Sequence, residues 1–540
     1  MILFIIPPCV YLLRRKKASN PWTLSSIIIG VVSILLVAVY LFWISSQIFF
    51  PGDILIWSES DFVNDILKFQ TSYPIYSAQE NNESFIYTPG AQILTYLLAR
   101  PFGKAIYIPK YRIVQVIFTL LAAVVASFCC RKLIEMSSSR QQFRGSTLWI
   151  TTSLSFLFLI ATNALTNPFM HNLHNDALAQ LISIIAYLVL LLYAFSRNKR
   201  LLILMAILPA VGFLVKQSLL IWAVFYCIYL TLFDQPRSKK RLLIFPLAAC
   251  GVIGTVVAVC YLLWGNHFTY WVFAVAGKRS VSPLRVFQHM LDVWVYIVIG
   301  LIGGIVLLRG KNFNLLLGSW LIWLSLMAIE AYTSGVAWML NHMGPGSLIA
   351  GCWFLAALVR VWPVVSRLNN KKFLLNNWMK AGITVAMIFF LFSGLGFVRI
   401  PLKSLQSDAY RYISDIEREF EGHSTEDVLL DIGTWVYLKD GVIMKDRSPS
   451  IGDRGYGEVG DFSGILGRLE QKKYSKILVR NLHSPDFQYD YWMWRKSSGI
   501  RQALLNNYKE IGQIKGVTSE KYQCNTFFFS EINILVPKID

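Results

Sequence analysis

The sequence predicts an α-helical polytopic membrane protein with about eleven transmembrane helices, followed by a small α/β domain. Of its 540 residues, 55% are hydrophobic, and the mean hydropathy is +0.50. The apolar residues form long blocks before residue 400, many of them near the roughly 20 residues that a helix needs to cross a ~30 Å hydrocarbon core. Short clusters of Lys and Arg separate these blocks, as is typical of cytoplasmic loops.

Residues 1–23 are expected to form a cytoplasmic or interfacial segment, and residues 24–399 a transmembrane domain. Because Lys and Arg are retained in the cytoplasm, the basic clusters set the direction of each span and place residues 400–540 outside. The spans at 200–215 and 217–233 are short and meet at Lys216. The predicted spans lie near residues 24–47, 113–129, 147–165, 175–195, 200–215, 217–233, 241–264, 291–308, 314–331, 346–363 and 378–397.

The C-terminal part, residues 400–540, has a different composition. It holds 19 Lys and Arg and 20 Asp and Glu, so it is almost neutral. Its apolar runs predict strands at 427–432, 476–481 and 527–536, and helices at 404–420, 462–473 and 493–507. These elements predict a small extracytoplasmic α/β domain.

The formal charge of +20 comes from the membrane part, where 32 bases face 11 acids. Since these bases lie in short loops between apolar blocks, they favour membrane lipids as partners and argue against nucleic acid. The eight cysteines show no metal-ligand spacing, so no metal site is predicted.

Acidic residues of the membrane part gather on its outer face. Six of the eleven lie in a long first outer loop, residues 48–112, and Asp176 and Glu330 lie at the outer ends of two spans. Such groups at a membrane boundary point to function. The loop also contains residues 84–103, which read as an interfacial helix introduced by the turn Tyr87-Thr88-Pro89. Two interpretations stay open: a solvated acidic loop, or a carboxylate general base held above a pocket at membrane level.

Other polar groups are predicted on the same face. The motif HNLHND contains His171, His174 and Asp176, and a zinc site there is the weaker interpretation. Lys216, followed by Gln217, lies between apolar runs and must either meet an anion or extend to the membrane surface. The further outer groups are His342, in the segment Asn341–Gly346, and the pair Lys278 and Arg279.

These motifs together resemble the GT-C polytopic glycosyltransferases, including the aminoarabinose transferase and protein O-mannosyltransferase branches. The resemblance covers most of residues 20–400 in layout. The resemblance rests on Glu59 three residues before Phe62 in WSESDFVNDILKF, and on the segments Tyr73 to Tyr76 and Tyr87 to Pro89. It also rests on Asp176 at the start of a span, on Lys216-Gln217 between two short spans, and on an outer C-terminal domain. The sequence departs from the family at Ser58-Glu59, where members have an Asp or an Asp-Glu pair, and at Thr88, where one branch has Lys.

The resemblance implies transfer of a sugar from a polyprenyl-phosphate donor to a glycan, lipid or protein acceptor at the outer membrane face, usually with inversion. It implies that Glu59 is the general base, with Asp61 and then Asp53 as the alternatives. Lys216, and in addition Arg279, would contact the phosphate. The remaining residues expected to shape the pocket or bind substrate are Tyr87, His171, His174, Asp176, Gln217 and His342. No cofactor is expected, though a divalent cation stays open.

Two other functions compete with this interpretation. A transporter or flippase would have internal repeats and broken helices near the membrane midplane. An O-antigen polymerase or ligase would have its large loop late in the bundle, whereas here it is the first loop. The sparse cysteines of the outer segments favour a bacterial plasma (inner) membrane as the location.

Overall fold

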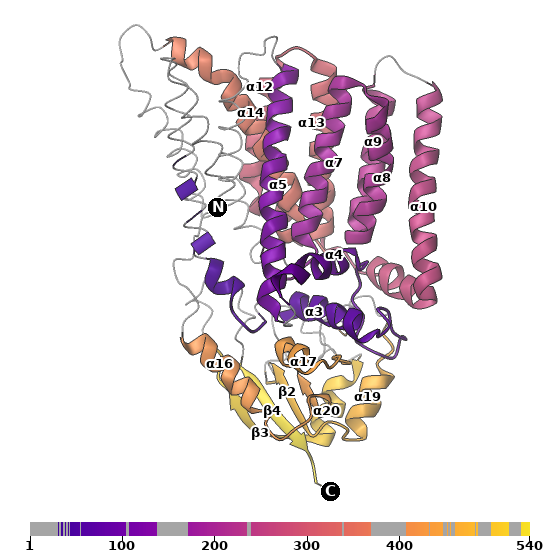
Figure 1. Cartoon of the computed structure of the whole chain (residues 1–540), viewed down its shortest axis with the longest axis vertical. Helices are drawn as coiled ribbons and strands as arrows, with labels where there is room; N and C mark the ends of the chain where they lie inside the picture. The colour runs from indigo at the N-terminus through magenta and orange to yellow at the C-terminus, as the bar shows by residue number, and fades with distance from the viewer. Residues whose placement is uncertain are drawn as a thin grey trace.

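The computed structural model describes residues 31–137, 171–368, 407–446, 451–483, 498–517 and 531–539, each range with short gaps. A bundle of long helices lies above a domain built on a β-sheet (Figure 1). The predicted spans at 147–165 and 378–397, together with the segment 1–23, lie outside the described residues.

The helices of the bundle coincide with predicted spans, with shifted ends. The first of them begins at Ile108, ahead of the predicted position 113, and runs to Ser137. The described helices of the bundle are α5 (Ile108–Ser137), α7 (Asp176–Ser196), α8 (Lys199–Val215), α9 (Ile221–Leu232), α10 (Lys239–Thr269), α12 (Trp294–Leu308), α13 (Phe313–Ser334) and α14 (Gly344–Leu368).

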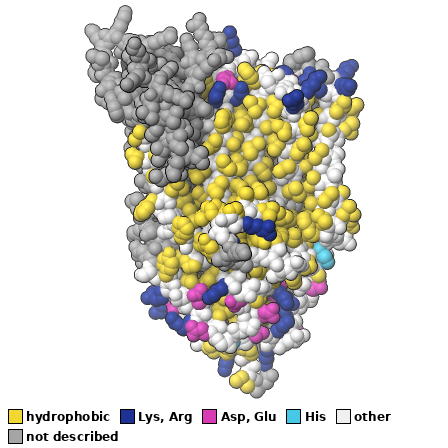
Figure 2. Space-filling model, in the orientation of Figure 1, with side chains coloured by type: hydrophobic (Ala, Val, Ile, Leu, Met, Phe, Trp, Pro, Cys, Tyr) yellow, Lys and Arg dark blue, Asp and Glu magenta, His cyan; other side chains and the backbone are white. Residues whose placement is uncertain are grey.

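The bundle has the dimensions and surface of an integral membrane protein. Within the described part of the chain, 5 helices are long and apolar enough to cross a membrane, or up to 6 if α11 (Pro283–Asp292) and α12 form one span bent by 64°. Figure 2 shows a broad apolar band on the bundle, with Lys and Arg at its upper end and mixed charges on the domain below. The predicted total of about eleven spans is not confirmed by these residues.

Close helix packing explains part of the sequence of α12. A Cβ on Gly303 would lie 2.6 Å from the backbone carbon of Trp353 in α14, closer than real Cβ atoms approach. Glycine at this position therefore lets the two helices touch along their backbones, as small residues do in membrane interfaces.

Two helices of the first outer loop lie between the bundle and the sheet domain. They are α3 (Ile56–Thr71) and α4 (Gly90–Ala99). On α4, Ile93, Leu94, Leu97 and Leu98 are each 37–48% exposed, and this spacing puts them on one face of the helix. An exposed apolar face is what an interfacial helix presents to lipid, so α4 agrees with the predicted interfacial segment.

The C-terminal domain contains a four-stranded sheet of order β1-β2-β4-β3. β1 (Val428–Leu430) pairs with β2 (Lys476–Arg480) in parallel, and β4 (Ile532–Pro537) pairs antiparallel with β2 and with β3 (Tyr508–Ile514). The accompanying helices are α16 (Ser407–Arg418), α17 (Thr434–Asp440), α19 (Ser463–Glu470) and α20 (Ile500–Asn507). The predicted strands and helices of this region all have counterparts, while β3 and α17 are additional.

Candidate active site

The carboxylate of Asp176 holds three chain segments together, at the end of the bundle near the sheet domain (Figure 1). It lies in the first turn of α7. Lys216 Nζ is 2.5 Å from Asp176 Oδ1. Asn341 Nδ2 donates to Oδ2 over 2.5 Å, and His174 Nδ1 is 2.6 Å from the same oxygen. All four side chains are buried, so their charges act on one another with little screening by water.

Lys216 lies at a break in the helices. Its backbone is extended (φ −157°, ψ 128°) and separates α8 from η2 (Gln217–Leu220), which continues into α9. Its Nζ also lies 5.5 Å from the centroid of the Tyr87 ring. Of the two environments predicted for Lys216, the structure shows an anion, because its partner is Asp176, 40 residues earlier in the chain.

A small cavity of about 50 Å³ adjoins this pair. It is lined by Asp176, Lys216, Glu330, Asn341 and His342, among others. Glu330 accepts hydrogen bonds from the Gly346 backbone N–H at 3.0 and 3.2 Å. A Cβ on Gly346 would lie 2.5 Å from Glu330 Oε2, so a larger residue there would displace the Glu330 carboxylate.

The first outer loop is fixed against the same region. Gln217 Nε2 donates to the carbonyl oxygens of Ile86 (2.7 Å) and Val272 (3.2 Å). The Thr88 hydroxyl donates to the Phe213 carbonyl, and Tyr87 makes an edge contact with His174. The predicted group Tyr87, His174, Asp176, Lys216 and Gln217 is therefore brought together.

Glu59 forms a separate buried ion pair in α3. Its Oε1 and Oε2 accept from Arg112 Nε (2.8 Å) and Nη2 (2.7 Å), and Oε1 also accepts from the Leu173 N–H (3.1 Å). Arg112 further donates to the carbonyl oxygens of Gln47, Phe50 and Gly52. Arg112 was not among the residues predicted from the sequence, although an arginine at the start of an apolar span was a signal for it.

The other acids of α3 are also buried. Asp61 is 1% exposed and lies two residues after Glu59. Asp65 accepts from Lys68 Nζ (3.3 Å) and from Gln92 Nε2 of α4 (3.2 Å), which joins the two helices of the loop. The outer acids of α3 are therefore built into the protein, and the interpretation as a solvated loop does not apply to them.

Asp53 attaches the first loop to the C-terminal domain. Its Oδ2 accepts hydrogen bonds from the backbone N–H groups of Gly433 and Thr434, both at 3.0 Å, and from the Thr434 hydroxyl at 2.8 Å. Burial raises the pKa of Asp53 to about 6 and Glu59 adds to the rise, whereas the three hydrogen bonds oppose it.

Since this pKa is raised above its ordinary value, the Asp53 contribution to stability is present below about pH 4 and is lost as the pH rises through about 6. Between these two pH values the free energy of unfolding should fall by about 3 kcal/mol. We expect Asp53→Asn to flatten this part of the stability profile, measured by thermal unfolding in detergent between pH 4 and pH 8. An Asp53→Asn profile as steep as the wild-type profile would contradict the assignment.

Further contacts join the same two parts. Asn64 and the backbone of Met444 exchange two hydrogen bonds, of 3.0 and 3.3 Å. Asn82 Nδ2 donates to Asp446 (2.9 Å), which is held by Arg468 at 2.5 Å. The C-terminal domain therefore packs directly against the first loop.

The segment 171–176 connects the two charged groups. The Leu173 N–H binds Glu59, and His174 binds Asp176. His171 Nε2 lies 2.6 Å from Gln47 Oε1, and burial together with Arg112 lowers the pKa of His171 to about 3, so its ring is neutral. The two histidines thus have different partners, and among the described residues no cluster of three or more metal-binding side chains occurs.

The two remaining predicted residues border this region. His342, in η4 (Leu340–Met343), interacts electrostatically with Lys216, Asp176 and Arg279. Arg279 is half-buried in the loop before α11. His342 therefore lies within electrostatic range of the Asp176–Lys216 pair, and Arg279 lies within range of His342.

Solved structures share this architecture. The aminoarabinose transferase ArnT from Cupriavidus metallidurans, in its apo state, matches with a TM-score of 0.55 and 10% identity over 84% of this chain and 92% of that one. ArnT bound to undecaprenyl phosphate matches with a TM-score of 0.57 and 9% identity, over 96% and 98%. The apo Archaeoglobus fulgidus oligosaccharyltransferase matches with 0.55 and 11% identity, over 91% and 73%. The chain has the GT-C fold.

The resemblance seen in the sequence is thereby confirmed at the level of fold. No protein-family model and no curated protein matches the sequence. At 9–11% identity a GT-C fold does not carry an activity with it, so function has to be argued from the site.

Proposed function

We propose that the chain is a membrane glycosyltransferase that moves a sugar from a polyprenyl-phosphate donor to a glycan, lipid or protein acceptor at the outer membrane face, with inversion. One observation carries the proposal. The carboxylates of α3 and the Asp176–Lys216 pair lie at the same end of the bundle and are joined by the segment 171–176, and α3 contacts the C-terminal domain through Asn64.

The reaction needs a base and a cation. A base takes the proton from the acceptor hydroxyl while its oxygen attacks the anomeric carbon, and the bond from that carbon to the phosphate oxygen breaks. The lipid phosphate leaves with the bonding electrons, and positive charge stabilises it. An ammonium has three N–H donors, of which Asp176 accepts one from Lys216, so the phosphate contact would share this lysine. Arg279 would be the second cation.

Of the three first-loop candidates, the proposal assigns the role of base to Asp61, which is buried in α3. Glu59 is held by the Arg112 guanidinium through both of its oxygens, and Asp53 is held by the C-terminal domain. Both carboxylates therefore hold other parts of the protein in place. Asp61 lies on the same helix, two residues beyond Glu59, and the proposal assigns it the proton transfer.

An assay with purified protein tests the function. The full chain in detergent or nanodiscs is incubated with a panel of polyprenyl-phosphate sugars and with lipid, glycan and peptide acceptors, and transfer is followed by mass spectrometry. We expect one donor to be consumed with release of polyprenyl phosphate. Movement of intact lipid-linked sugar between the leaflets of a vesicle, with no transfer, would overturn the proposal in favour of a flippase.

The orientation has its own test. Figure 2 shows Lys and Arg at the end of the bundle away from the sheet domain, and the positive-inside rule favours a cytoplasmic location for that end. With Cys250 and Cys524 replaced by serine, Glu470→Cys should react with an impermeant maleimide in intact cells. Lys240→Cys should react only after permeabilisation, and the reverse pattern would refute the orientation.

A further inference from the structure

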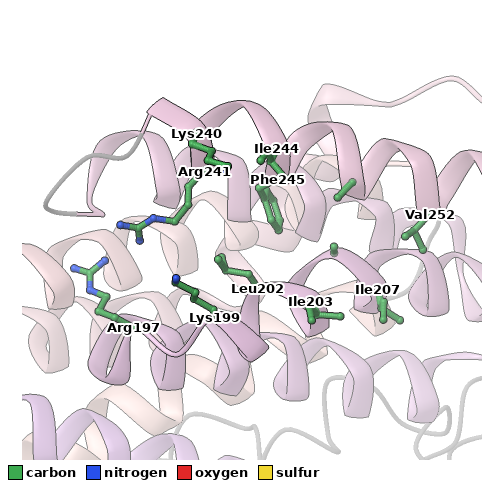
Figure 3. Close-up of a pocket in the computed structure, with 12 residues that line it drawn as sticks. Arg197, Lys199, Leu202, Ile203, Ile207, Lys240, Arg241, Ile244, Phe245 and Val252 are labelled. Carbon is green, nitrogen blue, oxygen red and sulfur yellow. The ribbon is translucent and has the colours of Figure 1, made fainter.

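A groove of about 780 Å³ lies between α8 and α10, at the end of the bundle opposite the candidate active site. Its volume is within the about 300–1,000 Å³ that is usual for small-molecule sites. Figure 3 shows its two ends. Arg197, Lys199, Lys240 and Arg241 gather at the mouth, and apolar side chains line the remainder.

The mouth of the groove carries an excess of positive charge. Asp234 is 2.7 Å from Arg241 and also pairs with Arg197, while the Tyr193 hydroxyl donates to the same carboxylate at 3.0 Å. Lys199 and Lys240 are exposed, and the described residues include no ion-pair partner for either. Four cations therefore face one carboxylate, which leaves the mouth attractive to an anion.

The cationic mouth is held in place by the fold. Arg197 has a positive φ of 57°, a conformation that non-glycine residues adopt rarely. It ends α7, and its backbone N–H donates to the Tyr193 carbonyl at 2.8 Å. This turn directs Arg197 to Asp234, so the charged end of the groove exists before any ligand arrives.

The apolar wall has the depth of one lipid leaflet. Lining positions follow a helical spacing on each helix, and they are Leu202, Ile203, Ala206 and Ile207 on α8 and Ile244, Phe245, Ala248 and Val252 on α10. At 1.5 Å per residue, the wall extends roughly 12–18 Å from the cations. Half of a ~30 Å hydrocarbon core is about 15 Å. Ile203 and Ile244 are 61% and 50% exposed, so the described protein leaves the wall open to lipid.

We propose that this groove binds an anionic glycerophospholipid of the cytoplasmic leaflet. The headgroup phosphate lies among Lys199, Lys240 and Arg241, and one acyl chain lies along the wall between α8 and α10. Basic pockets between transmembrane helices on the cytoplasmic side recognise anionic headgroups in this way. The site is separate from the proposed transfer reaction and stands whether or not that reaction is the correct one.

Native mass spectrometry of the full chain in detergent, with phosphatidylglycerol and phosphatidylcholine of identical acyl chains, tests the proposal. We expect preferential retention of phosphatidylglycerol. Lys199→Gln with Lys240→Gln should weaken it roughly 30-fold, at about 1 kcal/mol per cation. Ala248→Trp, which fills the wall and leaves the charges, should weaken binding of both lipids. The matched control is Arg309→Gln with Lys311→Gln, two exposed cations at the same end but outside the groove.

Equal retention of the two lipids would overturn the proposal. So would an equal loss in the control pair, because the lipid would then respond only to total charge. A preference for polyprenyl phosphate over phosphatidylglycerol would also overturn it, by making the groove a site for the carrier lipid.

Discussion

Replacing Asp61 by asparagine should lower the transfer rate by about 10²–10⁴-fold, the usual cost of removing a general base. The change keeps the size of this buried side chain and takes away its ability to accept the proton. Donor affinity and thermal unfolding should remain close to those of the wild type. Single-turnover transfer with a saturating donor measures the effect.

Glu59→Gln is the comparison that separates the two acids. This change leaves the Arg112 guanidinium buried without its counter-charge, so it should lower the unfolding temperature. The folded fraction of the Glu59→Gln protein should keep more transfer activity than the Asp61→Asn protein. The opposite ranking, with Glu59→Gln stable and inactive, would return the role of base to Glu59, as the spacing before Phe62 predicts. If Asp61→Asn, Glu59→Gln and Asp53→Asn all retain near-normal transfer, the first loop does not supply the base.

Lys216→Met should lower the free energy of unfolding by about 3–5 kcal/mol, because the change leaves the Asp176 carboxylate buried without its partner. It should also abolish measurable binding of the donor. Thermal unfolding in detergent gives the first quantity, and isothermal titration with the polyprenyl-phosphate sugar gives the second.

The double variant Lys216→Met with Asp176→Asn tells whether these two effects have one origin. Removing both charges takes away the unpaired carboxylate, so stability should largely return. Donor binding should not return, because the cation for the phosphate is still missing. Recovery of donor affinity together with stability would mean that Lys216 serves only as the counter-ion of Asp176.

Much of the site could be predicted from the sequence because ionisable residues are rare in apolar blocks. Asp176, Lys216 and His342 stood out for that reason, and they lie around one buried pair. Which residue neutralises which could not be predicted. Asp176 and Lys216 are 40 residues apart, and Arg112 and Glu59 are 53 apart, so their pairing depends on how the helices pack.

The fold shows the same division. The described helices of the bundle could be predicted because each coincides with a long apolar block of the sequence, whereas the strand β3 was not predicted. Its sequence, YKEIGQI, is exposed at most inner positions, as expected for the edge strand that it forms. An edge strand with one solvated side lacks the apolar alternation by which a strand is recognised.

The contacts between the first loop and the C-terminal domain also set an order of assembly. Asp53, Asn64 and Asn82 have partners that lie 381, 380 and 364 residues later in the chain. At ~5–20 residues per second, a ribosome makes those partners roughly 20–80 s after the loop has left it. During this interval Asp53, Asn64 and Asn82 lack these partners. The first loop therefore gains these three contacts only after the C-terminal domain has been synthesised.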